Sequence, residues 1–286
     1  MSRRDRPTGC DAIAAAFAGA AAERRAALIP FLAAGDPSPD AGVDIALAAA
    51  HAGADLLELG LPYADSLADG PTIRAAYERA LAAGTSTDAV LRCASRIGAR
   101  CGTPLVLMSA YNPILARRTD RFVAAAAEAG VAALLVPDLP VEDSTPLAET
   151  CARAGIALAL LVGPDTDDAR ATRIARAASG FVYVVRRRGV TGAGGAGASV
   201  PERVARLRAT GAPPIAVGFG IATPADAARE ARHADGVIVG SALVDQVARA
   251  LERRADPAGA VATAVADFAR ALRVPATATI DPQDAA

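Results

Sequence analysis

Eight short apolar runs recur along this chain, and segments rich in alanine and charged residues separate them. The strand candidates are residues 28–33, 55–60, 104–109, 132–137, 156–162, 181–185, 214–218 and 236–240. Apolar strands that alternate with amphipathic helices are typical of parallel strands buried on both faces. A (β/α)8 barrel needs about 250 residues and this chain has 286. The pattern therefore predicts an α/β fold of the (β/α)8, or TIM barrel, type.

Helices are expected between and around these strands. The segments between or after strands are 40–52, 71–82, 120–129, 144–154, 167–178, 200–209, 223–232 and 242–254, and further helices are expected at 10–24, 86–99 and 258–272. We expect residues 1–272 to form a single barrel domain with an extra N-terminal helix, and residues 273–286 to be a flexible tail. The alternative is an open, doubly wound sheet. It lacks support because no glycine-rich fingerprint follows the first strand.

Composition and charge argue against several classes of function. The net charge is −1 and aromatic residues make up 3% of the chain, unlike a nucleic-acid or anionic-membrane surface. No apolar run reaches the roughly 20 residues of a membrane span. The segment 10–24 superficially resembles a signal peptide, but Asp11 opens it and alanine dominates it, so we interpret it as a helix. The four cysteines lack a CxxC spacing, which predicts reduced thiols and a cytoplasmic location.

One carboxylate interrupts the second apolar run. Strand alternation places Leu57 and Leu59 on the face toward the helices. The same alternation points Leu56 and Glu58 into the barrel, with Glu58 near the carboxyl end of its strand, where barrel enzymes build their active sites. Burial would raise the pKa of this carboxyl group, which suits a general acid or base. The residues leave two interpretations open: a catalytic glutamate, or a structural one satisfied by an arginine or backbone donors.

Small residues follow the last two predicted strands. Gly220 comes after the seventh strand, and Gly240 and Ser241 come after the eighth and open a helix. Exposed N–H groups at a helix N-terminus attract phosphate, and many barrels bind phosphate with the loops after strands seven and eight. We therefore predict that Gly220, Gly240 and Ser241 bind phosphate. The alternative is ordinary turn and cap chemistry.

The glycine-rich segment 186–198 follows the sixth strand. Its length and composition favour a mobile lid that closes over a ligand, with a disordered connection as the alternative. Arg186, Arg187 and Arg188 at its start are interpreted as a solvated patch.

Several motifs, taken together, resemble the α subunit of tryptophan synthase across roughly residues 9–272. They are "LIPFLAAGDP" (28–37), "GADLLELGLPYADSLADGPTI" (53–73), "YNPIL" (111–115), "VPDLP" (136–140), "FVYVVRRRGVTG" (181–192), "GFGI" (218–221) and "VGSALV" (239–244). The "ELGxPxxDxxADGP" pattern, followed in order by "GVTG" and "GFGI", is highly specific.

The resemblance implies cleavage of indole-3-glycerol phosphate to indole and glyceraldehyde 3-phosphate, without a cofactor or metal in this chain. It also implies transfer of indole through a tunnel to a β subunit that carries pyridoxal phosphate, in an α2β2 heterotetramer. It assigns catalytic roles to Glu58 and Asp69, substrate contacts to Phe31, Tyr183 and Thr191, and phosphate contacts to Gly192, Gly220, Gly240 and Ser241.

The chemistry of such a cleavage suits these residues. All 30 cationic residues are arginine, so a lysine Schiff base is excluded. The two histidines, His51 and His233, lie in or directly after expected helices and do not indicate a metal site. The indole must then act as its own electron sink. Glu58 would exchange protons at C3 and at the C3′ hydroxyl, while Asp69, on a more polar loop, would stay ionised and bind the indole N1–H.

Some positions depart from the resembling pattern. Ala64 and Ser66 replace a usual Ser and Pro in a loop that would contact the β subunit. Ala110, Arg186 and Ala33 replace a usual Tyr, Ser and Thr around the site. These departures keep three further functions open: a free-standing lyase that releases indole, a non-catalytic subunit that binds ligand and activates a β partner, and another phosphosugar isomerase on the same fold. The "ELG…ADGP" motif argues against the isomerase.

Overall fold

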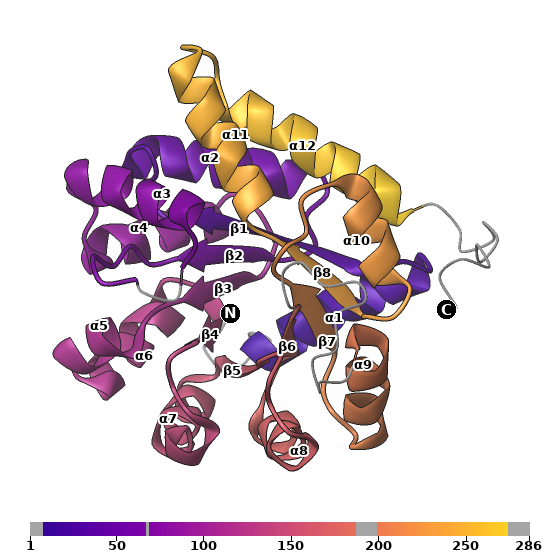
Figure 1. Ribbon diagram of the computed structural model, residues 1–286. Coiled ribbons are helices and arrows are strands. Elements are labelled where there is room, and N and C mark those ends of the chain that lie inside the picture. Colours follow the sequence, from indigo (N-terminus) through magenta and orange to yellow (C-terminus); the bar gives the residue numbers. More distant parts are fainter. Residues whose placement is uncertain (1–7, 67–68, 187–198, 274–286) are drawn as a thin grey trace.

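The computed structural model describes residues 8–66, 69–186 and 199–273 (Figure 1). Within these residues, parallel strands close into an eight-stranded barrel in which each strand pairs with the next and β8 pairs with β1. The strands are β1 (Ala27–Ala33), β2 (Leu57–Gly60), β3 (Leu105–Met108), β4 (Val131–Leu135), β5 (Ala157–Val162), β6 (Val182–Val185), β7 (Ile215–Gly218) and β8 (Gly236–Val239). All overlap the strands expected from the sequence. The barrel prediction is confirmed, and the open-sheet alternative is wrong.

Helices lie at every position where the sequence predicts one. They are α1 (Gly9–Ala22), α2 (Pro39–His51), α3 (Pro71–Ala82), α4 (Thr87–Gly98), α6 (Thr119–Glu128), α7 (Thr145–Ala154), α8 (Asp168–Ala177), α9 (Val200–Ala209), α10 (Pro224–Ala231), α11 (Ser241–Glu252) and α12 (Pro257–Leu272). Figure 1 shows them around the sheet, with α12 packed across α2, α10 and α11. None of the described helices is long and apolar enough to cross a bilayer.

Two short elements were not expected from the sequence, α5 (Tyr111–Ala116) and the 3-10 helix η2 (Val141–Asp143). The first turn of α5 has no local side-chain cap among the described residues. Its cap comes from the loop after β4, where Asp138 Oδ1 accepts a hydrogen bond from the Tyr111 backbone N–H at 2.9 Å. A distant cap leaves no local signal at Tyr111, so the pattern around "YNPIL" could not predict this helix.

The barrel has two apolar layers. Strand residues that face outward, including Leu57 and Leu59, pack with the surrounding helices. Residues that face inward, including Leu56 and Phe181, fill the barrel. This division follows strand alternation and places Glu58 on the inner side.

Helix α1 closes the amino end of the barrel. Its Ile13 and Phe17 belong to the inner layer, and the Phe17 ring lies 6.1 Å from that of Phe181. At the first residue of α1, a Cβ on Gly9 would overlap the carbonyl of Ala132 in β4, so the helix can approach the sheet closely only with glycine there. The carboxyl end of the barrel is therefore the end left for a ligand.

Candidate active site

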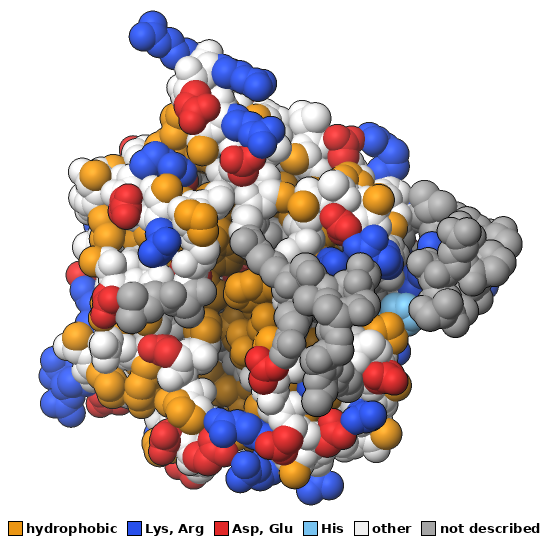
Figure 2. Space-filling view, viewed as in Figure 1, with side chains coloured by type: hydrophobic (Ala, Val, Ile, Leu, Met, Phe, Trp, Pro, Cys, Tyr) orange, Lys and Arg blue, Asp and Glu red, His pale blue; other side chains and the backbone are white. Residues whose placement is uncertain are grey.

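A cavity of about 310 Å³ lies at the carboxyl ends of the strands. Figure 2 shows apolar side chains lining a hollow near the centre of this face. Residues singled out from the sequence that line the cavity are Phe31, Glu58, Asp69, Tyr183, Gly220, Gly240 and Ser241. Thr191 and Gly192 lie outside the described residues, as does the predicted lid apart from Arg186.

Glu58 is buried in the cavity wall without a counter-charge. The residue is 1% exposed, and its Oε1 has no hydrogen-bond partner among the described residues. Burial raises the pKa of Glu58 to about 8, and the nearby Asp69 adds to the rise. The described residues thus offer this oxygen no arginine or backbone donor of the kind that a structural glutamate requires. A carboxyl group with this pKa is mostly protonated at pH 7 and can still release its proton at a slightly higher pH.

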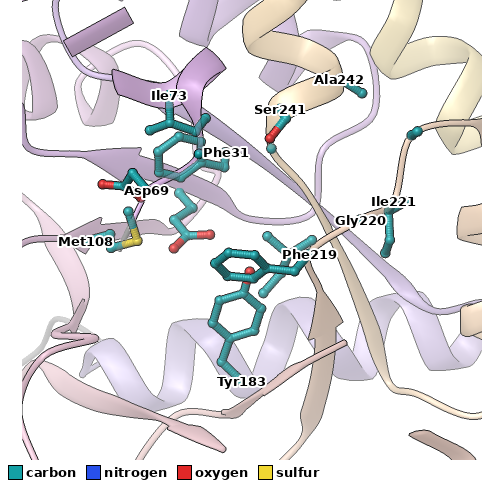
Figure 3. A pocket seen from close by; sticks show the side chains of 15 residues that line it. Phe31, Asp69, Ile73, Met108, Tyr183, Phe219, Gly220, Ile221, Ser241 and Ala242 are labelled. Atoms are coloured by element: carbon teal, nitrogen blue, oxygen red, sulfur yellow. The ribbon is translucent and has the colours of Figure 1, made fainter. Parts of the chain in front are cut away.

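Asp69 lies just before α3, and Figure 3 shows it on the same side of the cavity as Met108. Burial raises its pKa, and the positive charge of Arg74 acts in the opposite direction. Asp69 is therefore less solvated than the polar loop led us to expect. Glu58 and Asp69 repel each other when both are ionised, so a single proton shared by the pair is favoured. The carboxyl group without a cation nearby binds that proton more tightly. That group is Glu58.

Aromatic rings form the apolar part of the cavity. Phe31 pairs with Glu58 across β1 and β2. On the opposite side, Tyr183 and Phe219 lie against each other with their ring centres 6.0 Å apart (Figure 3). Burial, and then the charges of Glu58 and Asp69, raise the pKa of the Tyr183 hydroxyl well above its usual value. Tyr183 therefore stays neutral and offers the cavity a ring and a hydroxyl.

Sequence reasoning missed several residues that line the cavity. They are Gly70, Ile73, Met108, Phe219, Ile221, Ala222, Ile238 and Ala242. Phe219 had a signal, since it lies inside the "GFGI" motif from which we selected only Gly220. It is 42% exposed and has a positive φ of 71°, which is uncommon for a residue other than glycine. An exposed aromatic ring in a strained turn is typical of a binding site.

Two glycines make room for the aromatic rings. A Cβ at Gly60 would lie 2.6 Å from Phe31 Cζ and would overlap the Tyr77 hydroxyl. A Cβ at Gly218 would lie 2.7 Å from Tyr183 Cζ and would overlap its hydroxyl. Both glycines sit at the last position of buried strands, where the backbone has little freedom to move.

Replacing Gly218 with alanine should therefore displace Tyr183. We expect a loss of about 1–3 kcal/mol in the free energy of unfolding, as for other overpacked sites, together with at least roughly tenfold lower catalytic activity. Urea unfolding and an activity assay measure the two effects. The matched control is Gly19→Ala in α1, where an added Cβ meets no described atom within 4 Å. It should raise stability by about 0.5–1 kcal/mol. A Gly218→Ala chain with unchanged stability and activity would contradict the packing argument.

The polar end of the cavity is built from turns and a helix N-terminus. Gly220 follows β7 with a φ of 71°. Gly240 is the N-cap of α11, and no described side chain caps that helix. Ser241 and Ala242 open α11 at the cavity wall (Figure 3). Uncapped N–H groups and the positive end of the helix dipole give this side of the cavity an affinity for an anion.

The positions that depart from the resembling pattern have different surroundings. Ala33 is buried in the inner layer, Ala64 is exposed, and Ala110 is the N-cap of α5. The interpretation of Arg186 as part of a solvated patch is wrong. Its side chain is 26% exposed and its Nε lies 3.5 Å from Oε1 of the buried Glu230. A contact with a helix more than forty residues away leaves no trace in the local charge pattern.

The described residues contain no group of three or more His, Cys, Asp and Glu side chains that could hold a metal ion. The cavity instead holds two carboxyl groups beside apolar rings, with an anion-binding turn across from them. Glu58 is the one that keeps its proton, and Arg74 favours the ionised form of Asp69. Such a site can move protons on a planar apolar group that is attached to an anionic tail.

Comparisons with known proteins agree on one family. A sequence model described as "Tryptophan synthase alpha chain" matches residues 17–273. The chain is 46% identical over 233 residues to the tryptophan synthase alpha chain of Geobacter sulfurreducens, which covers 81% of this chain and 88% of that protein. It is 43% identical over 267 residues to that of Caulobacter sp. (strain K31), with coverage of 92% and 96%.

Solved structures give the same result. The tryptophan synthase alpha chain from Legionella pneumophila matches with a TM-score of 0.84 and 32% identity, covering 93% of this chain and 98% of that one. A chain of tryptophan synthase from M. tuberculosis matches with a TM-score of 0.82 and 31% identity, covering 92% and 98%.

Proposed function

The chain belongs to the tryptophan synthase alpha chain family, and from this premise we propose how its cavity acts. The protein is a lyase of tryptophan biosynthesis that cleaves indole-3-glycerol phosphate to indole and glyceraldehyde 3-phosphate. The observation that carries the proposed mechanism is the isolated, buried carboxyl group of Glu58. We propose that it is the proton donor and acceptor of this reaction.

The reaction needs one proton delivered and one removed. Glu58, neutral near pH 7 because burial raises its pKa to about 8, donates a proton to C3 of the indole ring. The resulting cation draws electrons from the bond between C3 and C3′. The C3′ hydroxyl loses its proton to the Glu58 carboxylate as that bond breaks, which yields indole and the aldehyde. Glu58 is protonated again at the end, so neither a redox partner nor water is consumed.

Asp69 supports this step from the side of the ring nitrogen. As C3 is protonated, positive charge develops on the indole and strengthens a hydrogen bond from N1–H to an ionised carboxylate. Arg74 favours the ionised form of Asp69, whereas no cation shifts the pKa of Glu58. The protonated Glu58 thus transfers the proton, and the ionised Asp69 stabilises the positive charge.

The remaining cavity residues bind the substrate in this proposal. Phe31, Tyr183 and Phe219 contact the indole ring, and the turn at Gly220 with the start of α11 holds the phosphate. Thr191 and Gly192 remain proposals from the resemblance alone. Since the chain contains no lysine, a Schiff base cannot replace the carboxylate mechanism.

A β subunit is the proposed partner, in an α2β2 assembly that passes indole between its sites. Support comes from solved tryptophan synthase among the structural neighbours and from the surface around α5, the helix that follows β3. Asn112 of α5 donates a hydrogen bond to the Tyr63 hydroxyl at 3.2 Å, and Leu115 is 49% exposed. An ordered polar pair beside an exposed apolar residue suits a protein interface. We also propose a cytoplasmic location and a single domain over residues 1–272.

Measuring indole release by the purified chain, with and without a β subunit, tests the function. We expect slow cleavage alone and much faster cleavage with β. Fast cleavage that β does not change would favour the free-standing lyase. Stimulation of β without any cleavage would favour the non-catalytic subunit, and would remove Glu58 from the mechanism.

A further inference from the structure

Arg186 joins three neighbouring elements at the carboxyl end of the barrel. It directly follows β6, and its backbone N–H donates to the Gly218 carbonyl at the end of β7, at 2.9 Å. Its side chain turns to the outer layer, where Nε lies 3.5 Å from Oε1 of Glu230 in α10. Its Nη1 is buried and has no hydrogen-bond partner among the described residues. The side chain as a whole is 26% exposed, and burying its Nη1 without a partner costs free energy that its other contacts must offset.

Glu230 is a buried carboxylate with two arginines nearby, Arg186 and Arg229. Its side chain is 8% exposed, and the other arginine near it, Arg229, has its Nε at 3.7 Å and a side chain that is 50% exposed. Arg229 also pairs with Asp226, so it is shared and solvated. Arg186 is consequently the more buried cation beside Glu230.

The two contacts of Arg186 lie on either side of the turn that connects β7 to α10. Its backbone contacts Gly218, just before the turn, and its side chain contacts Glu230, near the carboxyl end of α10. Phe219 and Gly220 in between both have φ of 71°. For Phe219 this left-handed conformation is strained, and such strain persists only where the surrounding structure over-determines it. Both residues line the cavity.

We propose that Arg186 is a positioning residue, which holds the Phe219–Gly220 turn in its binding conformation by tying β7 and α10 to the end of β6. The inference rests on the proposed function, because the turn is taken to contact the indole ring and the phosphate. Arg186 itself is not among the residues that line the cavity, so it would act through the turn rather than on a reacting atom. Its loss should weaken substrate binding far more than the chemical step.

The test compares steady-state kinetics of the full chain and its Arg186→Ser variant on indole-3-glycerol phosphate. We expect KM to rise about tenfold, while kcat stays within about twofold, because the turn loses its preorganisation and the carboxyl groups do not. The variant's Tm should fall by roughly 5–10 °C, since Glu230 is left buried without its partner. A purely structural role would reduce the amount of folded enzyme, and with it the apparent kcat, at unchanged KM.

Further variants distinguish the effect of the Arg186 charge on stability from its effect on the position of the turn. Arg186→Ser combined with Glu230→Gln removes both charges and should recover most of the Tm but not the KM. Arg186→Lys keeps a cation opposite Glu230 and should bring KM to within about threefold of the parent. The matched control is Arg229→Ser, which removes the exposed arginine near Glu230 and should leave KM unchanged.

The outcomes distinguish this inference from the function on which it rests. A parent chain that fails to cleave the substrate, alone and with a β subunit, overturns the proposed function. A parent chain that cleaves, with KM unchanged in Arg186→Ser or restored in the double variant, overturns only the positioning role.

Discussion

Replacing Glu58 with glutamine is expected to remove most cleavage of indole-3-glycerol phosphate, by about 10²–10⁴-fold in kcat. Glutamine has nearly the same shape but can neither donate nor accept the proton that moves between C3 and the C3′ hydroxyl. Substrate binding should persist because the aromatic rings and the phosphate turn are untouched. Indole release measures the loss, and titration with substrate measures the binding. Near-normal kcat would remove Glu58 from the mechanism.

The same variant should be more stable than the parent chain at alkaline pH. The pKa of Glu58 is about 8 in the fold against an ordinary value of 4.5, so the folded chain keeps a proton that the unfolded chain releases. The stability associated with this proton is fully present below pH 4.5 and is lost as pH rises through 8. Glutamine does not ionise. We expect a gain of a few kcal/mol at pH 8.5 and little difference at pH 4, measured by urea unfolding.

A surface glutamate provides the control for Glu58. Glu149 lies on α7 and is exposed, so Glu149→Gln should leave the rate of cleavage unchanged. If it caused a comparable loss of activity, the effect of Glu58→Gln could not be assigned to the cavity.

Replacing Asp69 with asparagine should be nearly as damaging, with a loss of about 10²–10³-fold in kcat. The amide can still accept a hydrogen bond from the indole N1–H, but it carries no charge to balance the cation that forms at C3. The variant offers a second readout as well. Asp69 helps to raise the pKa of Glu58, so removing its charge should lower that pKa.

The pH profile of kcat/KM measures this second effect. In the parent chain, activity should fall above about pH 8, as Glu58 loses the proton that it must donate. In Asp69→Asn the fall should begin at a lower pH. Asp44→Asn is the control, since the Asp44 side chain on α2 is 64% exposed and should affect neither rate nor profile. An unchanged profile in Asp69→Asn would show that the two carboxyl groups do not sense each other.

The sequence predicted the barrel and much of the cavity because both depend on short-range patterns. Strand alternation was enough to direct Glu58 inward, and the position of small residues after β7 and β8 was enough to select Gly220 and Gly240. These inferences need only the two-residue period of a strand and the common direction of parallel strands.

The features that the sequence did not reveal depend on contacts between distant segments. Helix α5 takes its cap from Asp138 after β4, and Arg186 pairs with Glu230 across two elements. Phe219 lies inside the "GFGI" motif, but its positive φ, unusual for a residue other than glycine, could not be predicted from the local sequence. The burial of Asp69 likewise depends on tertiary packing rather than on the polarity of its neighbours in the sequence.

Helix α1 packs against the inner layer at the amino end of the barrel, so the described residues leave the cavity no opening at that end. Among the described residues, the packed side chains of the inner layer block passage from the cavity toward α1, so the fragments of a split substrate leave on the side of the strand tips. An acceptor that intercepts the apolar fragment before it reaches water would therefore bind on that side of the molecule.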